Sequence, residues 1–389
     1  MFSRRVPAEL SPNRIALARE RAEVAFDLTA TNPTACGIAY PDRLLDALAD
    51  PRGLAYRPDP RGLASAREAV AAEYSRLGAE VAPDRIVLAA STSEAYAFLF
   101  KLLCEPGEAV LVPTPSYPLF EHLARVEGVG ALPYRLDPAA EWRLDPHELE
   151  RAPASVRAVV VVHPNNPTGS WVHPDDRAAL DALCARRGWA LIADEVFLDY
   201  PLAGGPGSGA SFAGQDAAAL TFALGGLSKC VGLPQLKLAW IVARGPEALV
   251  APALARLEFV ADTFLSVATP VQLALPALLR EGAAVRAAIR RRCEANLAAA
   301  PAELAAHPAV ALPPPGGGWS AVMRYPAVVG EEELVVELLE RDGVAVHPGF
   351  FFDFPHDGIL VLSLLPPPEV FAEGFRRVLR RIAAHLGGA

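Results

Sequence analysis

Two lysines, eight residues apart, are the first feature of the sequence that could do chemistry. The chain has 36 lysine and arginine residues together, and only Lys101, Lys229 and Lys237 are lysine. Arginine stays protonated in a protein, whereas a lysine amine can lose its proton and form a Schiff base with a carbonyl compound. Lys229 and Lys237 lie in the stretch GGLSKCVGLPQLKLAW. We therefore expect one of these two to be present for the chemistry of its amine.

Four predicted strands end next to polar side chains. RIVLAA is followed by the hydroxyl-rich STSEAY (91–96), and the valine run RAVVVVHP is followed by Asn165 and Asn166. WALIAD ends at Asp194, and LTFALGG precedes Lys229. In an open parallel sheet, ligands bind beyond the carboxyl ends of the strands. These four groups are therefore expected to share one site.

Each group also has a purely structural explanation. Hydroxyls at the start of a helix can hold a phosphate against free backbone N–H groups, or they can simply cap the helix. The asparagines can be turn residues, and Lys229 can be a solvated loop lysine. A carboxylate is costly to bury alone, so Asp194 is expected to face a cation, either in a site or in a structural salt bridge. Together the four offer the phosphate cradle, donor, carboxylate and amine that pyridoxal 5′-phosphate (PLP) requires.

The segments between these strands have helical patterns, which predicts an α/β fold. Apolar residues recur at helical spacing from Gly62, from near Ser93 and over residues 175–187. Strands and helices in alternation indicate a mostly parallel sheet flanked by helices.

A change in pattern towards the C-terminus predicts a second domain. A long helix rich in Ala and Arg is expected near residues 270–306, and WSAVMRYP, GVAVHPG and ILVLSLL have the pattern of strands of a smaller sheet. The last segment, EVFAEGFRRVLRRIAAHL, has the pattern of a closing helix. We predict a large domain of residues 41–280 and a smaller α/β domain of residues 1–40 and 281–389.

Composition excludes several classes of partner. The 389-residue chain has a net charge of −9 at pH 7, whereas surfaces that bind nucleic acid or anionic membranes are basic. We expect neither as a partner. The five cysteines are scattered without metal-ligand spacing, and the N-terminus lacks the apolar segment of an export signal. We expect no metal site, reduced thiols and a cytoplasmic location.

The motifs as a set resemble one family. They are YRPDPRG, STSEA, PTPSYP, NNPTG, DEVF and SK, followed eight residues later by a cation. In this order they are similar to the class I/II aminotransferases, which are fold-type I PLP enzymes, from about Asp27 to the end of the chain. The resemblance implies that fold, PLP as the cofactor, and a homodimer.

The resemblance also assigns roles to residues at matching positions. Lys229 would bind the cofactor as a Schiff base and later carry the substrate proton, and Asp194 would keep the pyridine nitrogen protonated. Asn166 would donate to the phenolic oxygen, and Tyr117 would stack on the ring. The other implied cofactor contacts, mostly at the phosphate, are Thr92, Ser93, Ser228 and Lys237, with Tyr56 reaching the phosphate of the partner subunit.

Three positions depart from the pattern of the family. Phe197 stands where a tyrosine usually donates to the phenolic oxygen, and Gly226 stands where a serine commonly contacts the phosphate. Val361 stands where an arginine usually binds the substrate α-carboxylate as a bidentate pair. Either the substrate lacks a carboxylate at that point, or another cation such as Arg57 or Arg61 replaces the missing one.

Three further residues match segments near the substrate. Asn32, in TATNPT, matches the N-terminal segment that folds over the substrate. Trp319 and His347 match small-domain segments at the mouth of the active site, but core packing explains them equally well.

The implied reaction is ping-pong transamination, in which an amino donor gives its nitrogen to the cofactor and a 2-oxo acid then accepts it. A β-lyase or decarboxylase on the same fold is an alternative, because the same lysine and aspartate would serve any α-carbanion. A cofactor-binding regulator would need a DNA-binding module ahead of this region, and only 26 residues precede Asp27.

Overall fold

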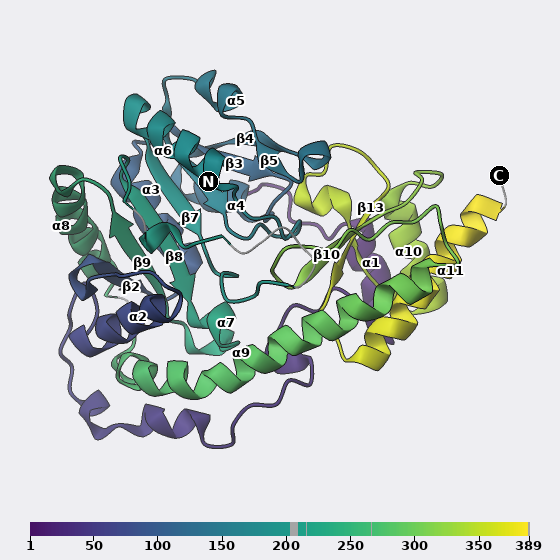
Figure 1. The fold of residues 1–389 in the computed structure, drawn as a ribbon, viewed down its shortest axis with the longest axis horizontal. Helices are drawn as coiled ribbons and strands as arrows, with labels where there is room; N and C mark the ends of the chain where they lie inside the picture. The colour runs from purple at the N-terminus through teal and green to yellow at the C-terminus, as the bar shows by residue number, and fades with distance from the viewer. Residues whose placement is uncertain (203–208, 215, 266, 388–389) are drawn as a thin grey trace.

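A large mixed sheet forms one half of the molecule (Figure 1). The structure is a computed structural model, and it describes residues 1–202, 209–214, 216–265 and 267–387. Within these described residues, the large sheet has eight strands. In spatial order they are β2 (Ile86–Ala89), β9 (Ala239–Arg244), β8 (Thr221–Gly226), β7 (Ala190–Asp194), β6 (Val156–Val162), β3 (Ala109–Thr114), β4 (Gly130–Asp137) and β5 (Arg143–Leu144).

The sheet is mostly parallel, as predicted. Strands β4, β3, β6, β7 and β8 pair in parallel. Strand β9 is antiparallel to both β8 and β2, so β2 again runs in the common direction. The four predicted strand ends that carry polar groups therefore lie at the same edge of the sheet.

Helices cover both faces of this sheet because its strands are apolar on both sides. All but one residue of the valine-rich strand β6 are buried. The core on one face includes apolar side chains of α2 (Ala64–Arg76), α6 (Pro174–Arg187) and the first half of α9 (Thr269–Leu304). The core on the other face includes those of α3 (Thr92–Leu103), α4 (Phe120–Glu127) and α8 (Glu247–Phe264). The short helix α5 (Pro146–Glu150) lies beside α6.

The other half is a smaller α/β unit. Strands β10 (Ser320–Arg324), β13 (Ile359–Ser363) and β12 (His347–Pro348) form an antiparallel sheet, and β1 (Phe26–Asp27) pairs with β11 (Val344–Ala345). The predicted single strand GVAVHPG is therefore wrong in detail, because its two halves pair in different sheets. The helices of this half are α1 (Arg14–Arg21), α10 (Glu331–Asp342) and α11 (Pro368–Gly387).

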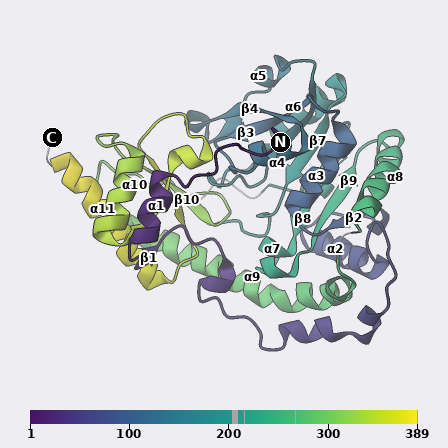
Figure 2. The same ribbon diagram turned by 180° about the vertical axis from the view of Figure 1, so that it is seen from behind.

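Helix α9 runs the length of both halves (Figure 1). Its buried side chains up to Leu279 belong to the core of the large sheet, and those from Val285 onward belong to the core of the smaller unit. Figure 2 shows the segment 41–57, with its short 3-10 turns, along the outer side of α9. No helix in the described part of the chain is long and apolar enough to cross a membrane.

Candidate active site

Lys229 lies one turn beyond the end of β8, on the four-residue helix α7 (Leu227–Cys230). Its Nζ atom is 4.8 Å from the ring centroid of Trp319 and 5.6 Å from that of Phe197. Burial among these groups lowers the pKa of the amine to about 8, although the charge of Asp194 acts in the opposite direction. An amine with this pKa is partly neutral at physiological pH, so it can act as a nucleophile and as a base.

Asp194 is the last residue of β7 and is buried. Its carboxylate accepts hydrogen bonds from the Tyr96 hydroxyl at 3.0 Å and from the Val196 backbone N–H at 3.1 Å. Burial raises its pKa to about 6, while these two bonds and the charge of Lys229 lower it. Within the described residues Asp194 forms no structural salt bridge, because both contacting donors are neutral, and a cation supplied by a ligand stays a prediction. The carboxylate keeps its charge available for a ligand.

At the start of α3, one hydroxyl of STSEAY caps the helix and two others are placed where a phosphate could bind. The Ser91 hydroxyl accepts from the Glu94 N–H at 3.1 Å, and the Glu94 carboxylate accepts from the Ala90 N–H at 2.6 Å. Ser91 is thus the helix cap. The hydroxyls of Thr92 and Ser93 are not needed for that cap and stand on the first turn, where the helix dipole favours an anion.

Lys237 and this helix start lie at the same end of the sheet. Ala89, the last residue of β2, pairs with Ala239, the first residue of β9, so the chain enters β9 from Lys237 where it leaves β2 towards Ser91. Lys237 is exposed and has a left-handed backbone, with φ of 51°. A cation, a helix N-terminus and the Lys229 loop therefore meet at this end of the sheet.

The same pairing explains the glycine at position 226. Gly226 pairs with Ala239, and a Cβ atom at Gly226 would lie 3.0 Å from the Ala239 Cβ and 3.2 Å from the Leu238 carbonyl oxygen. A serine there would force the strands apart by a few tenths of an ångström. The departure from the family pattern thus follows from close strand packing.

The two asparagines after β6 have different surroundings. Asn165 is buried, and its amide donates to the Pro115 carbonyl at 3.0 Å and to the Thr168 hydroxyl at 2.9 Å. It is a structural turn residue. Asn166 is only half-buried, and its side-chain oxygen lies 3.5 Å from the Ser320 hydroxyl of the smaller sheet. Asn166 is therefore the one suited to meet a ligand.

Tyr117 follows β3 and is 37% exposed. Burial and the charge of Asp194 raise the pKa of its phenol, which places it within electrostatic reach of that carboxylate. Its ring contacts Phe120 edge-on at 5.9 Å, and Phe120 contacts Tyr96 at 5.4 Å. An aromatic wall thus runs from Tyr117 to the hydroxyl that donates to Asp194.

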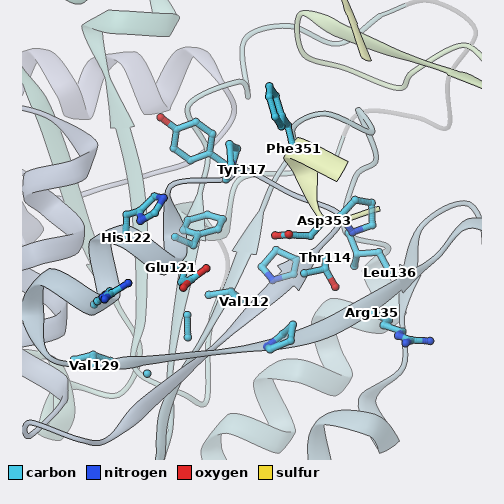
Figure 3. Close-up of a pocket in the computed structure, with 18 of the residues that line it drawn as sticks. Val112, Thr114, Tyr117, Glu121, His122, Val129, Arg135, Leu136, Phe351 and Asp353 are labelled. Carbon is cyan, nitrogen blue, oxygen red and sulfur yellow. The ribbon is translucent and has the colours of Figure 1, made fainter. Parts of the chain in front are cut away.

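A cleft of about 1560 Å³ opens on the outer side of Tyr117. Figure 3 shows Thr114 and Tyr117 at its rim, Glu121 and His122 of α4 on one side, and Phe351 and Asp353 of the smaller unit on the other. Neither Lys229 nor Asp194 lines it. The cleft meets the lysine and aspartate site only at its edge.

Three predicted site residues are exposed on the surface of the single chain. Tyr56 is 77% exposed and Arg57 is also exposed, both on the segment 41–57. Asn32 is exposed, and its side-chain oxygen accepts from the Thr34 N–H at 3.1 Å. The carbonyl of Ala30, two residues earlier, accepts from the Ser363 hydroxyl, which holds this segment against β13.

Val361 lies in an apolar wall. It is 1% exposed on β13, where it pairs with Val322 and His347. Phe352 and Phe354 pack into the same cluster. Burial lowers the pKa of His347 to about 4, so this side chain is neutral at pH 7 and offers a carboxylate no charge.

Sequence reasoning missed the role of Tyr96 and underestimated that of Trp319. Tyr96 lies in the quoted motif STSEAY, four residues after Thr92 and therefore on the same face of α3. This spacing is the feature of the sequence that could have indicated that Tyr96 lies at the site. Trp319 gave none, because only the folded chain brings the GGGW segment to Lys229.

Comparison with known proteins places the chain among enzymes. Residues 31–367 match the family described as aminotransferase class I and II. The chain belongs to this family. Members of the family depend on PLP, so the predicted cofactor, fold and enzyme class, a transferase of amino groups, are confirmed.

Individual relatives agree with this family. An alanine aminotransferase of Mycobacterium tuberculosis is 26% identical over 363 residues, which are 89% of this chain and 83% of the relative. A glutamate-pyruvate aminotransferase of Haemophilus influenzae is 27% identical over 265 residues, 67% of this chain and 65% of the relative. An S-alkyl-thiohydroximate lyase of Arabidopsis thaliana is 31% identical over 245 residues, 62% of this chain and 52% of the relative.

Solved structures share the fold. An alanine aminotransferase from Pyrococcus furiosus has a TM-score of 0.84 at 22% identity, covering 95% of this chain and 94% of that one. A tyrosine aminotransferase from Leishmania infantum also has a TM-score of 0.84, at 20% identity, covering 98% of this chain and all of that one.

The residues at the strand ends fit PLP. The buried carboxylate of Asp194 has only neutral donors in contact, which suits a protonated ring nitrogen. The buried amine of Lys229 is partly neutral, which suits an aldehyde. The first turn of α3, with Thr92 and Ser93 beyond the Ser91 cap, suits a phosphate.

Proposed function

We propose that this protein is a PLP-dependent aminotransferase that moves an amino group from an amino acid, or a related amine, to a 2-oxo acid in two half reactions. The observation that carries the proposal is the buried Lys229 amine, with its pKa lowered to about 8, in the field of the buried Asp194 carboxylate. When bound, PLP supplies an electron sink for the charge left on the substrate carbon after a proton is removed.

The chain's own residues divide the remaining work. Lys229 Nζ would hold the cofactor and, when free, would take the substrate proton and return it. The carboxylate of Asp194 would keep a proton at the ring nitrogen. Tyr117 would lie against the ring, and Asn166 would donate to its phenolic oxygen without help from Phe197. We assign the phosphate end to the helix start and the lysine loop, with Thr92, Ser93, Ser228 and Lys237 as contacts.

We further propose that the enzyme works as a homodimer. The exposed segment 41–57 carries Leu54, which is 91% exposed, and Tyr56, which is 77% exposed. An ion pair between Arg61 and Glu258, 3.2 Å apart, connects the chain just after this segment to α8, where Phe259 is 76% exposed. Large exposed apolar side chains of this kind are suited to a partner surface. Tyr56 and Arg57 would then enter the partner's active site, with Tyr56 at the phosphate.

The substrate contacts are proposed on the same basis. The wall at Val361 is apolar, so a substrate carboxylate must find its cation elsewhere. Arg61 is engaged with Glu258 and with the Asp84 carbonyl, which leaves Arg57 as the better candidate of the two. Asn32, on the segment held by Ser363, would lie over the substrate.

Two organisational proposals accompany the activity. The change of core along α9 between Leu279 and Val285 supports a large domain of residues 41–280 and a small domain of 1–40 and 281–389. All five cysteines are free, which agrees with a reducing compartment such as the cytoplasm.

A screen of single amino donors tests the activity. The purified protein, loaded with PLP, receives one donor at a time without an oxo acid, and the cofactor spectrum is followed. We expect conversion of the cofactor to its aminated form with release of an oxo product, and no conversion in a Lys229→Ala variant. Pyruvate, ammonia or carbon dioxide released without that form would instead establish a lyase or decarboxylase.

A further inference from the structure

The helix that carries Lys229 is too short to hold its own position. Helix α7 has four residues, far fewer than an isolated helix needs to be stable in water. Its last carbonyl groups need donors from elsewhere. The Gly232 backbone N–H donates to the Lys229 carbonyl at 3.3 Å. Two side chains add to this bond: the Tyr200 hydroxyl donates to the Lys229 carbonyl at 2.6 Å, and Arg286 Nε donates to the Cys230 carbonyl at 2.9 Å.

Tyr200 also fixes the aromatic side chain beside the lysine amine. It is fully buried, and its ring contacts Trp319 edge-on at 5.1 Å. Its backbone carbonyl accepts from the Gly318 N–H at 2.9 Å, and Gly318 directly precedes Trp319. One residue thus holds both the backbone of Lys229 and the indole that lies 4.8 Å from its Nζ atom.

Arg286 holds the same helix from the opposite side. It lies on α9 and is 8% exposed. Its guanidinium nitrogens are 2.7 Å from the Glu73 carboxylate and 3.4 Å from the Asp199 carboxylate, and Asp199 directly precedes Tyr200. The donor to the Cys230 carbonyl is therefore itself paired with two partly buried acids, on α2 and on the segment after β7.

We propose that Tyr200, assisted by Arg286, is a positioning residue that sets where the Lys229 amine lies against the paired rings of Trp319 and Phe197. The proposal rests on the proposed function, in which Lys229 holds PLP. Neither side chain touches the reacting atoms, so Arg286 acts through the backbone of residue 230, and Tyr200 acts through the backbone of residue 229 and through Trp319. Misplacing a reacting group by an ångström can reduce a rate about a hundredfold, so a small drift of α7 is enough to matter.

The test is a Tyr200→Phe variant of the holoenzyme, which keeps the ring and loses only the hydroxyl. Its matched control is Tyr134→Phe, because the Tyr134 hydroxyl makes an equivalent buried bond, to the Val160 carbonyl at 2.8 Å. Both variants lose one short tyrosine–carbonyl bond, Tyr200→Phe also loses a contact of 3.5 Å to the Cys230 carbonyl, and the two should lose similar thermal stability. For Tyr200→Phe alone, we expect a fall in kcat of about tenfold or more, a smaller change in KM, and a shifted pH midpoint of the cofactor absorbance.

Arg286→Lys gives a second variant, which keeps the charge beside Glu73 and Asp199 but replaces the guanidinium. We expect a shift of the pH midpoint in this variant as well, with the cofactor still attached to Lys229. If Tyr200→Phe and Arg286→Lys both match Tyr134→Phe in kcat and in pH midpoint, the positioning role is overturned. If the parent protein itself does not hold PLP at Lys229, the proposed function fails and this proposal fails with it.

Discussion

The hydrogen bond from Tyr96 to Asp194 gives the sharpest test of the site's electrostatics. The Tyr96 hydroxyl is buried 3.0 Å from the Asp194 carboxylate, and it lowers a pKa that burial has raised to about 6. A Tyr96→Phe variant keeps the aromatic contact with Phe120 and removes only the hydroxyl. We expect the aspartic acid to hold its proton to a higher pH and the apoprotein to bind PLP more weakly.

The size of the effect follows from the kind of bond. A buried hydrogen bond to a charged group contributes roughly 1.5–3 kcal/mol, and each 1.36 kcal/mol corresponds to about one pKa unit. Losing the bond should raise the pKa of Asp194 by roughly one to two units. The carboxylate, nearly all ionised at pH 7.5 in the parent apoprotein, would then be substantially protonated. An uncharged acid cannot hold a proton at the ring nitrogen, so we expect the Kd for PLP to rise by up to about fourfold as the ionised fraction of Asp194 falls.

The assay is a titration of the apoprotein with PLP, followed by quenching of tryptophan fluorescence, at pH 7.5 and at pH 9. The difference in Kd between variant and parent should be smaller at pH 9, because Asp194 is ionised in both proteins at that pH. Tyr134→Phe serves as the control for a lost buried hydroxyl. A Kd for Tyr96→Phe equal to that of the parent at pH 7.5, or a gap that does not change with pH, would refute the reasoning.

Two further predictions concern the substrate cation and the cost of burying Asp194. Arg57→Ala should raise KM for carboxylate-bearing donors about tenfold and leave the affinity for PLP unchanged. Arg61→Ala should change neither quantity, because Arg61 is engaged with Glu258. Equal effects of the two substitutions on KM would contradict the assignment. Burial raises the pKa of Asp194 from 3.8 to about 6, so the folded apoprotein binds the extra proton and this residue's contribution to stability falls as pH rises through that window. Denaturant unfolding should therefore show Asp194→Asn gaining about 3 kcal/mol relative to the parent between pH 4 and pH 7, and a constant difference would be inconsistent with the buried charge.

The sequence was sufficient to place the residues at strand ends. Asp194 ends one mainly apolar strand and Lys229 follows another, and a parallel sheet brings the carboxyl ends of its strands to one edge whatever the conformation of the loops. The structure then distinguished the two neighbouring asparagines, whose residue type and position in the turn are alike. Asn165 is buried in its turn and Asn166 is not, a distinction that depends on the neighbouring Pro115 carbonyl and is invisible along the chain.

Contacts made across the fold could not be predicted in the same way. Trp319 meets Lys229 only because the GGGW segment docks against Tyr200, which is over a hundred residues away along the chain. The sequence could not show that the phenol of Tyr96, a neutral donor from α3, hydrogen-bonds to Asp194 without adding another buried charge. The crowding that requires Gly226 arises from the register of β8 against β9.

The most direct test of the central claim is to find where the cofactor is attached. The freshly reconstituted protein is reduced with borohydride, digested and mapped by mass spectrometry. We predict one phosphopyridoxyl adduct, on the Nζ atom of Lys229, and none in Lys229→Ala. An adduct on Lys101 or Lys237, or no adduct in protein that has bound PLP, would contradict the account.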